Sequence, residues 1–118
     1  MCGIVASISR PLERPWTAIK HRGCRSTHIG PIIHQRLPIR DLDPSYDQPL
    51  QKDLWTIAFV GEFFGLPQNI HETDHVVRTF IQGPKTFHQM QQDGFWSIVA
   101  AKDKKLHLLT DYLSLIHI

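Results

Sequence analysis

Residues 54–64, LWTIAFVGEFF, carry the strongest strand signal in the chain. The stretch is rich in aromatic and β-branched side chains, which favour extended backbone. Gly61 interrupts it and predicts a bulge or the close approach of another backbone segment. The segments on either side of this strand therefore decide which kind of sheet protein the sequence encodes.

The flanking segments alternate between strand and helix signals. Strands are predicted over residues 2–9, 29–37, 94–101 and 106–111, and helices over residues 15–20, 75–82 and 85–92. The helix over residues 75–82 has Thr73 or Asp74 as its predicted N-cap. The last two strands flank a charged tip and predict a β-hairpin. This order indicates an α+β domain with sheets packed against helices.

Length and composition set limits on the function. The 118 residues amount to one domain or part of one, and 42% hydrophobic residues are enough for a packed core. The net charge of +2 is too small to indicate nucleic-acid binding, and no apolar run reaches the length of a membrane span. Two cysteines are too few for a disulfide framework. The sequence predicts a cytoplasmic protein without membrane or nucleic-acid partners.

Cys2 follows the initiator methionine directly. Cysteine is small enough to permit removal of Met1, which would leave Cys2 with a free α-amino group. A thiol is a good nucleophile, and an α-amine with a pKa of about 8 is a useful general base. One residue could therefore supply both groups, although a small residue at the start of a strand is the alternative interpretation.

Short motifs follow Cys2 along nearly the whole chain. They are CGIV at 2–5, HRG at 21–23, HQRLPI at 34–39, QPL at 48–50, VGEFF at 60–64, TD at 73–74, DGFW at 93–96 and TD at 110–111. In this order they resemble the class II glutamine amidotransferases, which are N-terminal-nucleophile hydrolases, and in particular the asparagine-synthetase branch. The resemblance implies an αββα four-layer sandwich, incomplete at its C-terminus.

The resemblance also implies an activity and its residues. Cys2 would attack the side-chain amide of glutamine, and the Gly61 N–H would donate to the oxyanion. The implied substrate-binding residues are Arg36, Ile39, Glu62 and Asp74. Independently of the family, a free amino acid requires one cationic and one anionic group, and an arginine suits a carboxylate because its guanidinium binds it in a bidentate manner.

The implied partner is a synthetase domain that would follow on the same chain and use the ammonia. ATP and Mg²⁺ are expected there, and no cofactor is expected in this domain. An asparagine-synthetase-like partner fits the motifs best, and a 7-cyano-7-deazaguanine synthase-like partner is the alternative.

Two departures from the family pattern bear on activity. Val60 stands where the family has an asparagine that completes the oxyanion hole, and loss of one such donor costs about 10²–10³-fold in rate. Cys24 stands where the family usually has proline. A domain that has lost catalysis, and only binds glutamine or braces a synthetase, is therefore a second hypothesis.

One motif in the sequence indicates a different function from the amidotransferase. Residues 71–75, HETDH, fit the H-E-x-x-H pattern of zinc hydrolases, which needs both histidines on one helical face. We expect His71 to lie outside the helix, so zinc hydrolysis is a remote alternative.

Residues 113–118, LSLIHI, match a translated sequencing adaptor, and we expect them to be read-through after a partial amidotransferase domain over residues 1–112.

Overall fold

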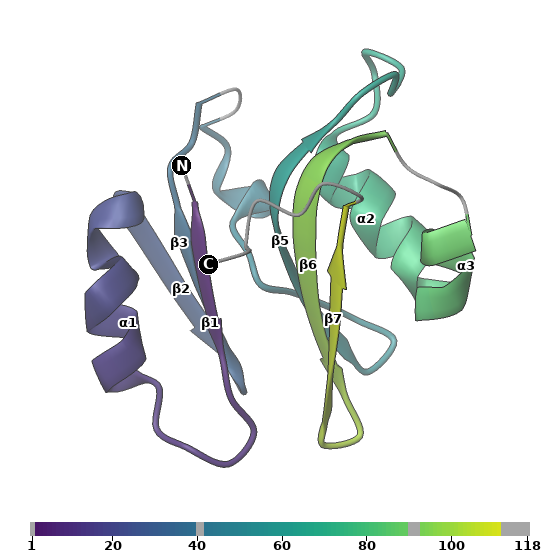
Figure 1. Ribbon diagram of the computed structural model, residues 1–118. Helices are drawn as coiled ribbons and strands as arrows, with labels where there is room; N and C mark the ends of the chain where they lie inside the picture. Colours follow the sequence, from purple (N-terminus) through teal and green to yellow (C-terminus); the bar gives the residue numbers. More distant parts are fainter. Residues whose placement is uncertain (1, 40–41, 90–92, 112–118) are drawn as a thin grey trace.

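The computed structural model describes residues 2–39, 42–89 and 93–111. Their strands form two antiparallel sheets that lie face to face, with the orders β1-β3-β2 and β4-β5-β6-β7 (Figure 1). The strands are β1 (Gly3–Ala6), β2 (Arg25–Ile29), β3 (Ile32–Arg36), β4 (Leu50–Lys52), β5 (Trp55–Phe63), β6 (Gly94–Lys102) and β7 (Lys105–Thr110). The helices are α1 (Glu13–Ile19), α2 (Glu72–Ile81) and α3 (Pro84–Gln89), with 3-10 turns η1 (Lys20–Arg22) and η2 (Pro44–Tyr46). The adaptor read-through expected at 113–118 lies outside the described residues.

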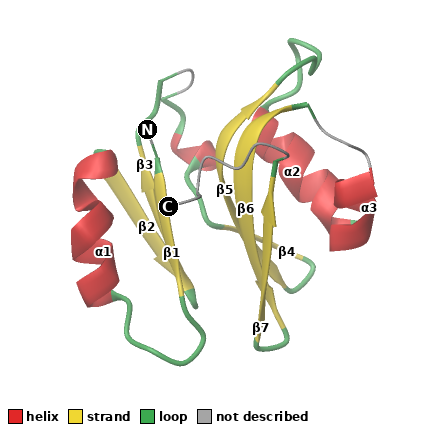
Figure 2. Cartoon of the chain, viewed as in Figure 1, coloured by secondary structure: helices red, strands yellow, loops and turns green. Residues whose placement is uncertain are grey.

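The fold class predicted from the sequence, an αββα four-layer sandwich, is wrong. The described chain is a small β-rich domain, in which seven strands form two antiparallel sheets and 26% of the residues are helical. α1 lies beside the three-stranded sheet (Figure 2), but it has only 7 residues and none of them is buried. A helix this short and this exposed does not cover a sheet, so the first sheet lacks the helical layer that the resemblance implied.

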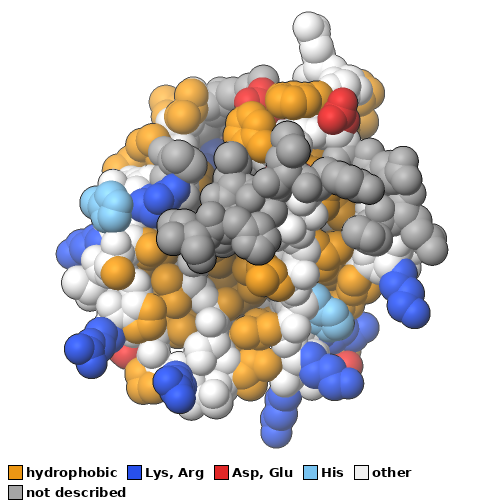
Figure 3. All heavy atoms as spheres, viewed as in Figure 1, with side chains coloured by type: hydrophobic (Ala, Val, Ile, Leu, Met, Phe, Trp, Pro, Cys, Tyr) orange, Lys and Arg blue, Asp and Glu red, His pale blue; other side chains and the backbone are white. Residues whose placement is uncertain are grey.

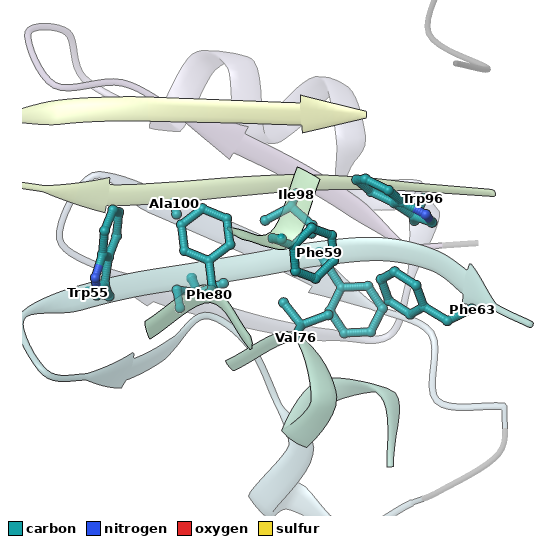
Figure 4. Close-up of a cluster of buried hydrophobic side chains, with 10 residues drawn as sticks. Trp55, Phe59, Phe63, Val76, Phe80, Trp96, Ile98 and Ala100 are labelled. Atoms are coloured by element: carbon teal, nitrogen blue, oxygen red, sulfur yellow. The ribbon is translucent and has the colours of Figure 1, made fainter. Parts of the chain in front are cut away.

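The main hydrophobic core lies between the second sheet and helices α2 and α3. Side chains from one face of β5 and β6 meet α2 there, and Figure 4 shows Phe80 and Val76 among them. Phe80 and Phe87 are fully buried, and Phe80 packs edge-on against Trp55. The aromatic residues that marked β5 in the sequence thus stabilise the sheet by binding α2 to it.

Phe80→Ala is expected to reduce the free energy of unfolding by about 3–5 kcal/mol, because it leaves a cavity at the centre of this core. Urea denaturation measures the change. Phe64→Ala is the matched control, since Phe64 is 52% exposed and its loss is expected to cost about 0.5 kcal/mol or less. Equal losses in the two variants would contradict the assignment of the core.

The strand predictions are confirmed in part. β5, β6 and β7 are present, and positive φ values at Asp103 (52°) and Lys104 (58°) give the hairpin the turn geometry that short antiparallel connections favour. Residues 29–37 are not one strand, because the chain reverses at Gly30, where φ is +52°, and pairs β2 with β3. At Gly61 the register of β5 with β6 is continuous, but an added Cβ would collide with the Phe95 carbonyl. The close approach is therefore confirmed and the bulge is not present.

The predicted helix over residues 75–82 begins earlier in the structure. α2 starts at Glu72, and its N-cap is His71 rather than Thr73 or Asp74, since the His71 ring accepts a hydrogen bond from the Thr73 N–H at 3.2 Å. In the described part of the chain, α2 is the longest helix with 10 residues, and none of these helices has the length and apolar character needed to cross a membrane.

Candidate active site

Cys2 and Arg36 belong to one row of side chains across the first sheet. Gly3 pairs with Gln35, so the register of β1 with β3, continued by one residue, sets Cys2 opposite Arg36. On the other side of β3, Arg25 of β2 pairs directly with Arg36. Side chains alternate between the faces of a sheet, so these three residues share a face with Ile4 and face the second sheet.

The same face becomes more apolar with distance from Cys2. The next row contains Ile4, His34 and Thr27, and the row after that contains Ala6, Ile32 and Ile29. In that last row, Ile32 packs against Ala58 of the second sheet. The apolar rows hold the two sheets together, and the charged row is at the end of the stack where the chain begins.

Backbone contacts fix the position of Cys2. The Arg22 Nε donates a hydrogen bond to the Cys2 carbonyl at 3.0 Å, and the Leu37 N–H lies 3.4 Å from the Cys2 sulfur. Cys2 is half-buried, Cys24 is exposed, and both thiols are free. Arg22 belongs to the HRG motif, but its contact with Cys2 could not be predicted because it joins residues 20 positions apart.

Arg36 is buried and held by the loop that contains η2. Its Nη1 donates to the Asp47 carboxylate at 2.6 Å and to the Asp43 carbonyl at 3.0 Å. Asp47 also pairs with Arg25, whose Nε lies 3.4 Å from the same carboxylate oxygen. Asp43 accepts hydrogen bonds from Ser45 that hold the pKa of its carboxyl below the ordinary value, with a further contribution from Arg36 and Arg25. In the sequence, Asp43 and Asp47 stand among turn-forming residues, a signal that could have indicated these partners.

The second sheet presents Val60 and Glu62 toward the first sheet. Both lie on the same face of β5 as Ala58, which packs on Ile32, and they follow it toward the end of the stack that holds Cys2. Val60 is half-buried and has no donor at the predicted oxyanion position. Its cross-strand partner is Ser97, a buried residue whose hydroxyl shares this face. Gly61 lies between Val60 and Glu62 with a φ of +123°, which glycine adopts readily.

Two of the sequence-predicted site residues lie apart from this row. Ile39 follows β3 and is 80% exposed. Asp74 is exposed in the first turn of α2, which packs on the opposite face of the second sheet. The geometry thus groups Cys2, Arg36 and the Val60–Glu62 segment, and it gives no support for a role of Ile39 or Asp74.

His34 lies one row beneath Arg36 and is 1% exposed. Neither of its ring nitrogens has a hydrogen-bond partner in the structure. The pKa of His34 is lowered from 6.5 to about 4, mainly by burial and to a smaller extent by the Arg36 charge, while the Phe59 backbone and the Asp47 charge offset part of this change. His34 is therefore neutral in the folded protein at neutral pH.

This burial predicts a loss of stability in mild acid. In the unfolded chain His34 binds a proton near its ordinary pKa of 6.5, whereas in the folded chain it does so only near pH 4. The neutral His34 therefore contributes stability to the folded protein above pH 6.5, and this contribution is lost as the pH falls toward 4. Between about pH 8 and about pH 5 the contribution of His34 to the free energy of unfolding is expected to fall by about 2 kcal/mol. Urea denaturation at a series of pH values measures it. His34→Leu should flatten the dependence, and a variant of the exposed His28, His28→Gln, should retain it; an unchanged slope in His34→Leu would contradict the account.

The zinc-hydrolase alternative finds no support in the helix geometry. His71 lies outside the helix as its N-cap and stacks on Tyr46, with 3.6 Å between ring centroids, while His75 packs against Phe63. The two histidines are therefore engaged in different contacts. Within residues 2–39, 42–89 and 93–111, no group of three metal-binding side chains is present.

A groove of about 540 Å³ lies at the opposite end of the stack from Cys2. It is lined by the turns that follow β1, β2, β4 and β6, and its rim includes Arg10 and the lysines of the β6–β7 hairpin. Figure 3 shows Lys and Arg side chains along the lower rim of the molecule. The groove is open, and Cys2, Arg36 and Glu62 are not among its lining residues, so we place the candidate site at the other end, around Cys2.

No family model, curated protein or solved structure matches this chain. The side chains that the two sheets bring together are therefore the basis for a functional assignment.

Proposed function

We propose that the protein hydrolyses glutamine to glutamate and ammonia through a covalent intermediate on Cys2. The observation that carries this proposal is the strand register, which sets Cys2 opposite Arg36 on the face of the first sheet that packs on the second sheet. Glu62 is two strand positions beyond Val60 on the face of β5 that contains Ala58. A nucleophile, a cation and an anion on facing surfaces are the groups required to hold and attack a zwitterionic amino acid.

The reaction begins with removal of Met1, which frees the Cys2 α-amine. The amine accepts the thiol proton as the sulfur adds to the side-chain carbonyl carbon of glutamine, forming a tetrahedral oxyanion that the Gly61 N–H stabilises. The carbon–nitrogen bond then breaks, and the nitrogen leaves as ammonia with the proton returned by the amine. Water attacks the thioester, and glutamate leaves as the thiol is restored.

Arg36 and Glu62 bind the two charged groups of the substrate. The Arg36 guanidinium pairs with the α-carboxylate, because its planar donors match two carboxylate oxygens. Glu62, from the facing sheet, pairs with the α-ammonium. The hydrogen bond from Arg36 to Asp47 fixes the guanidinium before the substrate arrives, which reduces the conformational entropy lost on binding.

The ammonia passes, in this proposal, to an ATP-dependent synthetase domain that would follow on the same chain, in the cytoplasm. An asparagine-synthetase-like domain is the first candidate, and a 7-cyano-7-deazaguanine synthase-like domain is the second. ATP and Mg²⁺ belong to that domain, and the residues described here would bind glutamine alone.

Val60 favours a second candidate function, a domain that binds glutamine without hydrolysing it. Val60 faces the first sheet but offers no hydrogen bond to an oxyanion. Ser97 beside it carries a hydroxyl on the same face and supports retention of slow turnover. The two candidates share the binding residues and differ only in the release of ammonia.

Calorimetric titration with glutamine, together with an assay of glutamate formation, separates these functions. Binding with glutamate formation supports the hydrolase, and binding without it supports the non-catalytic domain. The control ligand is D-glutamine, which reverses the positions of the carboxylate and ammonium relative to the side chain. Absence of binding to L-glutamine would contradict both candidates.

A further inference from the structure

The Asp47 carboxylate forms ion pairs with two arginines near Cys2, Arg25 and Arg36. The Asp47 oxygen that accepts the hydrogen bond from Arg36 at 2.6 Å is also the oxygen that lies 3.4 Å from the Arg25 Nε. The side chains of Arg36 and Asp47 are 9% and 19% exposed, and that of Arg25 is 29% exposed. Such pairs interact more strongly than surface ion pairs, because the surrounding protein screens them less than water does.

The Arg25 guanidinium is only partly satisfied by this arrangement. Its Nη2 donates to the Leu42 carbonyl at 2.9 Å, but its buried Nε has no hydrogen-bond partner. Among the described residues, the buried side-chain nitrogens and oxygens that lack such a partner are Arg25 Nε and both ring nitrogens of His34. These atoms belong to adjacent rows on one face of the first sheet, next to Cys2. Buried polar groups are normally hydrogen-bonded. Arg25 Nε has only its 3.4 Å ion pair with Asp47, and the His34 nitrogens lack hydrogen bonds, so this place favours a polar ligand.

The other described charges near this row do not cancel the second guanidinium. Arg22 adds a further cation, with its Nε on the Cys2 carbonyl. The Asp43 carboxylate is fully exposed and accepts the hydrogen bond from Ser45, so solvent screens its charge. Glu62 belongs to the facing sheet. The first sheet therefore presents a cationic surface beside Cys2, and Glu62 presents an anionic one opposite.

We infer that Arg25 and Arg36 together form a subsite for a carboxylate, and that Asp47 sets its charge and positions Arg36. Arg25 is thus a specificity-determining residue that none of the sequence motifs includes. The chemical class of ligand is a small carboxylate with its reacting carbon within reach of Cys2. The identification of this carboxylate with that of glutamine rests on the proposed function, whereas the subsite itself does not.

The test compares the alkylation rates of Cys2 by anionic iodoacetate and by neutral iodoacetamide. Both reagents react with the same thiolate, so the ratio of their rates reports the local charge and is independent of the thiolate fraction. The full chain is used with Cys24→Ser, which leaves Cys2 as the one thiol. Arg25→Gln is expected to lower the iodoacetate-to-iodoacetamide ratio about threefold, and Asp47→Asn to raise it about threefold, for a unit charge roughly 8–10 Å away.

Shifts in opposite directions support the subsite, because local unfolding would change the ratio in the same direction in both variants. Arg25→Lys keeps the charge and is expected to keep the parent ratio. An unchanged ratio in Arg25→Gln and Asp47→Asn, or a shift in the same direction in both, would overturn the inference.

Glutamine kinetics then connect the subsite to the proposed function. Arg25→Gln is expected to raise KM about tenfold with kcat unchanged, and Arg25→Lys to restore part of the loss. If the alkylation ratios shift in opposite directions while no variant forms glutamate, the carboxylate subsite stands and the proposed hydrolysis fails. A fall in kcat with KM unchanged would contradict a binding role for Arg25.

Discussion

Cys2→Ala is expected to abolish glutamate formation, with a fall in kcat on the order of 10³-fold or more, because the variant has no nucleophile to form the thioester. Binding of glutamine should persist, since Arg36 and Glu62 are unchanged. The fold should also persist, because Cys2 is half-buried and its sulfur makes two long contacts with the Leu37 backbone, at 3.4 Å to the N–H and 3.9 Å to the carbonyl. A coupled assay for ammonia and a titration with glutamine measure the two properties in the same preparation.

The chain offers a matched control for this experiment. Cys24→Ser removes the other thiol, which is exposed and lies at the start of β2 on the outer edge of the first sheet. Its activity is expected to equal that of the unsubstituted protein. Ammonia release that persists in Cys2→Ala, or that disappears in Cys24→Ser, would remove Cys2 from the mechanism.

Val60→Asn is expected to raise kcat about 10- to 100-fold, with little change in KM. Asparagine would place a side-chain N–H on the face of β5 that looks toward the first sheet, at the proposed oxyanion position, where valine has no donor. The gain is expected to be smaller than the 10²–10³-fold typical of a single oxyanion donor, because the Ser97 hydroxyl shares this face. Steady-state glutaminase kinetics measure it.

Val60→Ala is the control for the change in size, since it opens the same space without adding a donor. It is expected to leave kcat within about twofold of the starting value. An equal gain in Val60→Ala and Val60→Asn would show that access rather than hydrogen bonding limits the rate. No gain in Val60→Asn would contradict the placement of the oxyanion beside residue 60.

Local patterns predicted the long elements of the fold well. β5 is recognised by its run of apolar residues, and the β6–β7 hairpin by two apolar runs that flank a charged turn. In both cases the signal is contained in a short stretch of sequence. β2 was missed because its sequence, RSTHI, is polar and alternates only weakly, and it is stabilised by pairing with β3. The fold class was wrong because the extent of a helical layer depends on what α1 buries, and its sequence does not reveal that none of its residues is fully buried.

The candidate site was predicted only in part, for a related reason. Of the residues in the proposed site, Cys2 was predicted from its place after Met1, and Arg36 from the family resemblance and its suitability for binding a carboxylate. Arg25 and Asp47 were not found, because their relation to Arg36 is set by the pairing of β2 with β3 and by the course of the η2 loop. Such contacts depend on register between distant segments, and a single sequence contains no direct signal of register.

The central claim is that the Cys2 sulfur lies where it reacts with the side chain of a bound glutamine. Covalent labelling tests it most directly, with a diazoketone analogue in which the amide nitrogen of glutamine is replaced by an electrophilic carbon. Mass spectrometry of the digested protein is expected to find the label on Cys2 of chains that lack Met1, and an excess of L-glutamine should prevent the labelling. Label found on Cys24 instead, or labelling of Cys2 that glutamine does not slow, would contradict the claim.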